Sequence, residues 1–253
     1  MRAQHIGRAL LLMLALALLV GGCASHKAYR QKQARASRNL GERYLANNQT
    51  SKALEQFLKA LEIYPADPYL HYDLALVYDM KGALDKTEYH LKEAIELKPD
   101  YSAAYNYLGF VYFRAGKVDK AIDYYHKALA NMLYLNPQDA HLNLGVAYVS
   151  RKEYHKAIVQ LKKTIKLVPD FAAGYNNLGQ AYEGLGQYDK ARYNYEKALE
   201  FNPQYANAYL NLGKLLYRSG ERKKARWSFS QVIRLAVDSE MAMEAQSYLR
   251  RLK

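Results

Sequence analysis

The side chains that carry chemistry in proteins are spread thinly along this chain, and their spacing matches no catalytic or metal-binding pattern. The seven histidines never have the spacing of a helical metal-binding pair; they are His5, His26, His71, His90, His126, His141 and His155. A glycine-rich phosphate loop and a nucleophile motif are also absent from the sequence. We therefore predict that the chain is not an enzyme and has no catalytic residue, no metal site and no small-molecule substrate.

The single cysteine, Cys23, stands directly after an apolar run near the start of the chain. Arg2 and Arg8 give the chain a basic beginning, Ala9 to Val20 is unbroken apolar sequence, and two glycines then precede Cys23. This order is typical of a secretory signal peptide. The run is shorter than the roughly 20 apolar residues that a membrane-spanning helix needs. We predict that residues 1–22 are a signal peptide that is removed.

The four residues Val20-Gly21-Gly22-Cys23 resemble the lipobox of bacterial lipoproteins. In that family the cysteine receives a diacylglyceryl group and a third acyl chain and becomes the first residue of the mature protein. More than one chain is what stable anchoring requires. The resemblance implies a covalent lipid on Cys23 and no other cofactor. Ala24 follows Cys23, and by the sorting pattern of enteric bacteria it implies the periplasmic side of the outer membrane. The alternative is an ordinary signal peptide with an incidental cysteine.

The chain is strongly basic, with a formal charge of +13 over 253 residues. Such a balance suggests anionic surfaces or acidic partners. Because the charge is not confined to one arm, and because export would remove the chain from nucleic acid, we predict no nucleic-acid partner. Residues 23–33 contain Lys27, Arg30 and Lys32 without an acid. They form either a basic tether on anionic head groups or a solvated linker that leads into the first helix.

A Leu-Gly or Leu-Ala pair recurs along the rest of the chain, with leucine spacings of 34, 34, 36, 34 and 34 residues. A fixed period of this length indicates a repeat array. The pairs begin at Leu40, Leu74, Leu108, Leu144, Leu178 and Leu212.

Each repeat has the pattern of two helices joined by a turn, which is clearest over residues 172–205. Tyr175, Leu178 and Tyr182 share one helical face, and Gly186 ends that helix at a position where positive φ is wanted. The second helix carries Ala191, Tyr195 and Ala198 at its inner face. The small residues let the two helices approach closely. Gly82, Gly116 and Gly220 stand at the equivalent turn in other repeats, where two repeats have Asn48 and Lys152 instead.

This pattern resembles the tetratricopeptide repeat. The resemblance implies an all-α fold, a right-handed α-α superhelix of six repeats over 34–239, followed by a capping helix over 240–253. The predicted repeats are 34–67, 68–101, 102–137, 138–171, 172–205 and 206–239. One irregularity lies in the third repeat, where Ala128 and Pro137 are nine residues apart against five in the first. We predict that Asn131 to Tyr134 add one turn to a helix, either as a partner contact or as a harmless lengthening.

In this family the first helices line a groove that holds another polypeptide. Asparagines at regular intervals there can bond both N–H and C=O of an extended peptide, although asparagine can also simply solvate a helix. The groove positions of this chain are Tyr72, Leu76, Asn106, Phe110, Phe113, Asn143, Val146, Asn177 and Asn211.

A lipobox followed by six such repeats resembles the pilotin lipoproteins of type IV pilus systems. This implies a secretin as partner and a role in its outer-membrane localisation and assembly. A lipoprotein adaptor for cell-wall enzymes or other envelope complexes is the alternative.

Overall fold

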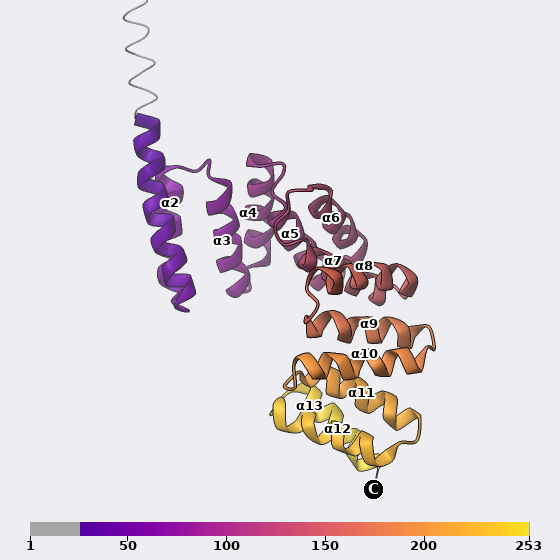
Figure 1. Ribbon diagram of the computed structural model, residues 1–253. Helices are drawn as coiled ribbons and strands as arrows, with labels where there is room; N and C mark the ends of the chain where they lie inside the picture. The colour runs from indigo at the N-terminus through magenta and orange to yellow at the C-terminus, as the bar shows by residue number, and fades with distance from the viewer. Residues whose placement is uncertain (1–25, 253) are drawn as a thin grey trace, which may run out of the picture. The chain divides into compact units, whose positions relative to one another are not determined.

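The computed structural model describes residues 26–252, and these contain α-helices and no β-strand. The predicted signal peptide and Cys23 lie outside the described residues, so both remain predictions. After a first helix over residues 26–46, the helices are α2 (Thr50–Ile63), α3 (Pro68–Met80), α4 (Leu84–Leu97), α5 (Ser102–Arg114), α6 (Val118–Ala130), α7 (Pro137–Ser150), α8 (Tyr154–Leu167), α9 (Ala172–Gly184), α10 (Tyr188–Phe201), α11 (Ala206–Arg218), α12 (Arg222–Leu235) and α13 (Glu240–Arg251). Figure 1 shows them succeeding one another as helix pairs.

The helices belong to two compact units, which divide at Ala104 and Tyr105 within α5. In the first unit the core is built by Phe57 of α2 with Leu70, Leu74 and Val77 of α3, all fully buried. Helix α3 begins with Pro68 at a position that needs no N–H donor, and the Asp67 side chain accepts from the Tyr69 backbone N–H at 2.9 Å. In the second unit α7, α9, α11 and α13 pack in sequence, and each of α7, α9 and α11 also packs on its own partner helix.

Close approach within five of the six helix pairs depends on a glycine of the first helix that faces a large side chain of the second. In α3 the equivalent residue is Ala75. A Cβ on Gly179 would lie 2.5 Å from Cε1 of Tyr195, and one on Gly109 would lie 2.7 Å from Cε1 of Tyr125. The tyrosines occupy the space that the missing Cβ leaves, and both are 1% exposed. The predicted role of the Leu-Gly pair is therefore confirmed by the packing of α9 on α10 and of α5 on α6.

The turns between paired helices contain one residue with positive φ each. The four glycines predicted there have φ between 71° and 81°, and Asn48 and Lys152 have φ of 57° and 62°. A left-handed conformation costs a non-glycine L-residue roughly 1–2 kcal/mol, and asparagine tolerates it better than lysine. The sequence therefore accepts strain at Lys152 that it avoids in the glycine-containing turns.

The irregularity in the third repeat forms a longer connection and does not lengthen a helix. Helix α6 ends at Ala130, and α7 begins at Pro137. The prediction that Asn131 to Tyr134 add a helical turn is thus wrong. Asn131 stops the helix because its side chain accepts from the Leu133 backbone N–H at 2.9 Å, which offers the chain a turn in place of the helix. Pro137 does not close the third repeat but begins the next helix, as Pro68 does in α3.

The N-terminal end of the array differs from its predicted boundary. The first described helix includes residues 26–33, which we assigned to the tether, so the basic residues Lys27, Arg30 and Lys32 lie on a helix that continues to residue 46. At the other end α13 is the predicted capping helix. Ser239 caps it by accepting from the Ala242 backbone N–H at 3.2 Å, and Tyr248 stacks on Phe229 with ring centroids 4.8 Å apart.

A buried histidine pair joins α3 to α4 in the first unit. Nδ1 of His71 and Nδ1 of His90 are 3.0 Å apart, and His71 Nε2 lies 2.9 Å from the Pro65 carbonyl oxygen. Because that oxygen only accepts, His71 Nε2 carries the proton, and neutral His90 must donate to His71 Nδ1. Burial, followed by the positive charge that His71 and Lys86 can carry, lowers the pKa of His90 to about 4.

This pair makes the stability of the first unit sensitive to acid. A lowered folded-state pKa means that the contribution of His90 is present above its unfolded pKa of about 6.5 and is lost as pH falls from there through about 4. We expect His90→Asn, which keeps a donor but does not titrate, to flatten the fall in melting temperature over this window. The matched control is His155→Asn at an exposed position. The melting temperature is measured by circular dichroism as a function of pH. If it fell equally with pH in wild type and in His90→Asn, this role of His90 would be contradicted.

Candidate functional site

The predicted groove residues of the second unit lie on the same face of successive first helices. Asn143 Nδ2 on α7 donates to Asn106 Oδ1 on α5 at 3.1 Å, which places these two positions side by side. Asn211 Nδ2 on α11 likewise donates to Asn176 Oδ1 on α9 at 2.9 Å. These two asparagine pairs belong to one continuous stack of first helices, because α7 packs against α9 and α9 packs against α11. This face, formed by the first helices α5, α7, α9 and α11, is called the first-helix face below.

The asparagines on this face are already partly engaged with one another. Asn143, Asn177 and Asn211 are 34 residues apart, and each uses its Nδ2 inside the protein. Asn177 Nδ2 donates to the Ala173 carbonyl oxygen at 2.8 Å, and the other two donate to asparagine oxygens. In all three the Oδ1 atom keeps its accepting capacity. The three side chains therefore present acceptors suited to the backbone N–H groups of a bound segment.

Apolar side chains lie next to the asparagines on the same helices. Phe110 follows Asn106 by one turn and Val146 follows Asn143 by one turn, a spacing that puts each pair on one helical face. Phe110, Phe113 and Val146 are all partly exposed. Phe110 also stacks on Tyr107 with ring centroids 6.0 Å apart and lies under the Arg114 guanidinium at 5.4 Å. The second unit therefore combines an apolar surface with a row of amide acceptors.

Tyr72 and Leu76 belong to the first unit, where both are partly exposed on α3. Tyr72 contacts Tyr101 with ring centroids 5.3 Å apart.

The residue after Tyr72 is Asp73, whose carboxyl group has an unusual pKa. Burial raises the pKa of Asp73 to about 7, and the negative charge of Glu42 adds to this rise. The positive charge of Arg38, 3.7 Å from Asp73, lowers this pKa, but the same guanidinium also pairs with Asp67 at 2.9 Å and with Glu42 at 3.1 Å. Near neutral pH, Asp73 is therefore a carboxyl group that is partly protonated rather than a fixed negative charge.

Two basic residues of α11, Lys214 and Arg218, are neutralised by acidic neighbours that are distant in the sequence. Lys214 pairs with Glu244 of the capping helix at 2.6 Å. Arg218 pairs with Glu183, which also accepts from the Tyr195 hydroxyl at 2.7 Å. Burial and the charge of Glu183 raise the pKa of Tyr195. These residues hold α9, α10, α11 and α13 together and leave little free positive charge for an acidic ligand.

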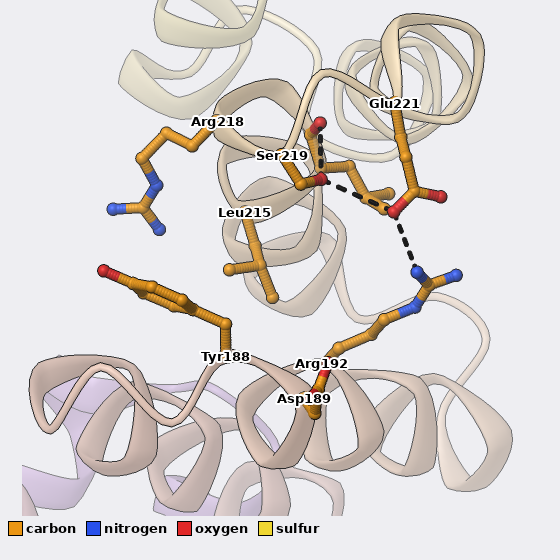
Figure 2. A pocket seen from close by; sticks show the side chains of 8 residues that line it. Tyr188, Asp189, Arg192, Leu215, Arg218, Ser219 and Glu221 are labelled. Atoms are coloured by element: carbon orange, nitrogen blue, oxygen red, sulfur yellow. Dashed lines mark hydrogen bonds and ion pairs between the residues drawn. The ribbon is translucent and has the colours of Figure 1, made fainter.

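A pocket of about 280 Å³ lies beside these ion pairs, between the start of α10 and the turn after α11. Figure 2 shows Tyr188 and Arg218 on one side of it and the ion pair of Arg192 with Glu221 on the other. It is lined by Tyr188, Asp189, Arg192, Leu215, Leu216, Arg218, Ser219 and Glu221. Among its charged groups, Arg192 pairs with Glu221 at 2.9 Å, and Arg218 pairs with Glu183 outside the lining.

Over residues 26–252, no group of three or more His, Cys, Asp or Glu side chains could hold a metal ion. None of the helices in the same range is long and apolar enough to cross a bilayer.

Family profiles decide the nature of the array. The profile described as TPR repeat matches residues 41–82, 145–186 and 184–220, and the profile described as Tetratricopeptide repeat matches residues 102–131. Together these matches cover more than half of the chain. The chain belongs to the tetratricopeptide-repeat family. The predicted all-α fold of six such repeats with a capping helix is thereby confirmed, and proteins of this family bind protein or peptide partners.

Solved tetratricopeptide-repeat structures match this chain over most of its length. The type IV pilus biogenesis factor PilW is 22% identical with a TM-score of 0.77, over 84% of this chain and 98% of PilW. Pseudomonas aeruginosa PilF is 22% identical with a TM-score of 0.74, over 87% of this chain and 99% of PilF. The resemblance to these pilus proteins that the sequence indicated is therefore found in the fold.

The first curated relatives match about half of this chain. Human protein O-mannosyl-transferase TMTC3 is 34% identical over 143 residues, which is 55% of this chain and 15% of TMTC3. The chain spans a fifth or less of the first curated relatives that it matches. The transferase activity in that name concerns the whole of TMTC3. The absence of catalysis here remains a prediction.

Proposed function

We propose that this tetratricopeptide-repeat protein is a lipid-anchored scaffold that binds a secretin and assists its localisation and assembly in the outer membrane, as a pilotin of a type IV pilus system. The observation that carries this proposal is the match to PilW and PilF over nearly the whole of both proteins. The lipobox at Cys23 supplies the anchor in this proposal, and the first-helix face supplies the binding surface.

The first-helix face has the chemistry to hold an extended or partly apolar segment. Three asparagine Oδ1 atoms at one-repeat intervals accept backbone N–H groups, and a hydrogen bond of this kind contributes about 1 kcal/mol net. Three such bonds give direction and register but little affinity. Burial of apolar surface contributes about 25 cal/mol per Å², so Phe110, Phe113 and Val146 must supply most of the binding free energy.

A matched pair of substitutions tests this surface. Val146→Asp places a charge among the apolar residues of the first-helix face on α7. Val159→Asp places the same charge on α8 of the same repeat, where Val159 is 53% exposed. We expect Val146→Asp to reduce capture of the secretin by the tagged, intact protein from detergent-solubilised envelopes about tenfold or more, the loss typical of a buried contact residue. Val159→Asp should capture it as wild type does.

Both variants should keep the wild-type circular dichroism spectrum, because both sites are partly open to solvent. Equal capture by both variants would contradict the assignment of the site to this face. Recovery of cell-wall hydrolases without any secretin would contradict the pilotin role and support the adaptor role.

A further inference from the structure

The connection between α6 and α7, residues 131–136, carries the most exposed apolar side chains in the described part of the chain. Met132 is 99% exposed, Leu133 is 85% exposed and Leu135 is 90% exposed. The other connections from a second helix to the next first helix, such as residues 168–171 and 202–205, are two residues shorter. Solvent exposure of three apolar side chains on one short turn is unfavourable unless something covers them. We name residues 131–136 the apolar loop.

Two backbone N–H groups of the apolar loop form hydrogen bonds to acceptors within the loop itself. The Leu133 backbone N–H donates to Asn131 Oδ1 at 2.9 Å, and the Tyr134 backbone N–H donates to the Asn131 carbonyl oxygen at 3.2 Å. Asn131 and Tyr134 are half-buried and form the base of the turn. Internal bonding matters because an unsatisfied N–H group is costly in an apolar medium. The tip can therefore leave water without losing these two bonds.

Exposed lysines lie near the C-terminal ends of two helices of the same unit that end close to the loop. Lys127 lies in the last turn of α6, directly before the loop. On α8, the Thr164 hydroxyl donates to the Gln138 carbonyl oxygen at 3.3 Å, which brings the end of α8 to the start of α7 where the loop ends. This part of α8 carries three exposed lysines, Lys162, Lys163 and Lys166.

Acidic residues are absent from the segments next to the tip. None occurs between Asp123 and Asp139, which bracket the loop, or between Glu153 and Asp170, which bracket the lysines of α8. Within these two segments the fully charged side chains are therefore all basic, and the nearest acids in sequence are those that bracket them.

We propose that the apolar loop inserts into the interfacial layer of an anionic phospholipid membrane, with the four lysines lying on the head groups. Apolar side chains of peripheral proteins enter the boundary between head groups and acyl chains to a depth of about 5–10 Å, and nearby lysines are attracted to anionic lipid. This contact belongs to the second unit of the chain and does not require a lipid on Cys23.

The shape of the loop favours a bilayer over a protein partner. A specific protein interface usually needs about 1,000 Å² or more of complementary surface, and a six-residue turn with outward side chains offers far less. A fluid lipid interface adapts to a small tip. Lysines spread over two helices also suit a diffuse anionic surface better than a set of discrete ion pairs.

Fluorescence of a single tryptophan at the tip tests the insertion in the full-length chain. The one natural tryptophan is replaced by Trp227→Phe, which keeps an aromatic ring beside Tyr209, and Leu133→Trp is added. The protein is mixed with vesicles of phosphatidylglycerol and phosphatidylethanolamine that contain brominated phospholipid. We expect the indole at position 133 to shift to shorter emission wavelength and to lose most of its emission by quenching.

The matched control is Val159→Trp in the same Trp227→Phe background, which should show neither the shift nor the quenching, whatever else anchors the chain. Lys163→Gln with Lys166→Gln should weaken the quenching at position 133, and phosphatidylcholine vesicles should give little. An indole at position 133 that stays solvent-exposed on anionic vesicles overturns the proposal. Shielding that occurs only when envelope proteins are added also overturns it, because the loop would then contact a protein. Either result leaves the secretin capture test unaffected.

Discussion

Gly179→Ala is expected to lower the free energy of unfolding by about 3 kcal/mol, at the upper end of the range for overpacked cores. In an exposed helix the same change is favourable by about 1 kcal/mol, so the expected sign is reversed. The reason is geometric. The new Cβ would lie 2.5 Å from Tyr195 Cε1 and 3.1 Å from the Ala191 carbonyl oxygen. Urea unfolding followed by circular dichroism measures the change.

The Tyr195 ring cannot move aside easily. It is 1% exposed, and its hydroxyl is held by Glu183 at 2.7 Å. The control is Gly186→Ala in the same repeat, where the added Cβ meets nothing within 4 Å but φ is +71°. This second change should cost only the roughly 1–2 kcal/mol of a left-handed residue. If Gly179→Ala were as mild as Gly186→Ala, close helix contact at Gly179 would not be what sets the geometry of the pair.

The sequence predicts the repeat architecture well because the close contacts occur between residues that are near in the chain. Gly179 and Tyr195 are 16 residues apart, and the same interval separates Gly109 from Tyr125 and Gly213 from Phe229. A fixed interval with complementary sizes is visible without coordinates. The residues with positive φ between paired helices were predictable for the same reason, since each of these turns has one position that favours glycine, whereas the positive φ of Asp238 was not predicted.

The candidate site was less predictable, because its details depend on contacts between repeats. The sequence indicated which asparagines share a face. It did not show that Asn143 bonds to Asn106, 37 residues away, or that Asn211 bonds to Asn176, 35 residues away. Those bonds decide which amide atoms remain for a ligand. The ion pair of Lys214 with Glu244 was missed similarly, because it joins a repeat to the capping helix.

The apolar loop shows where local signals are ambiguous. Four extra residues before Pro137 were compatible with a longer helix, because Met132 and Leu133 are good helix formers. Asn131 can instead bond to the backbone two residues on, and Pro137 can begin a helix as well as follow one. In the structure Asn131 does accept from the Leu133 backbone N–H, and Pro137 does begin a helix.

Cys23→Ser is expected to remove all acyl mass from the protein and to remove the protein from the outer-membrane fraction. The predicted anchor has more than one acyl chain, and each buried CH₂ group contributes about 0.8 kcal/mol to membrane attachment. The apolar loop and the basic helix over residues 26–46 add only weak, salt-dependent attachment by comparison. Intact-protein mass spectrometry and density-gradient fractionation measure the two losses. Ser25→Ala, which leaves the lipobox intact, is the control.

The anchor and the first-helix face are separate parts of the chain in this proposal, so their losses should be separable. Cys23→Ser should still capture the secretin from solubilised envelopes, because it leaves the array unchanged. Val146→Asp should lose capture but keep its acyl mass and its fractionation. A Cys23→Ser protein that keeps both lipid and outer-membrane location would show that Val20-Gly21-Gly22-Cys23 is not a lipobox. A Val146→Asp protein that leaves the membrane would show that the partner, rather than the lipid, holds the chain there.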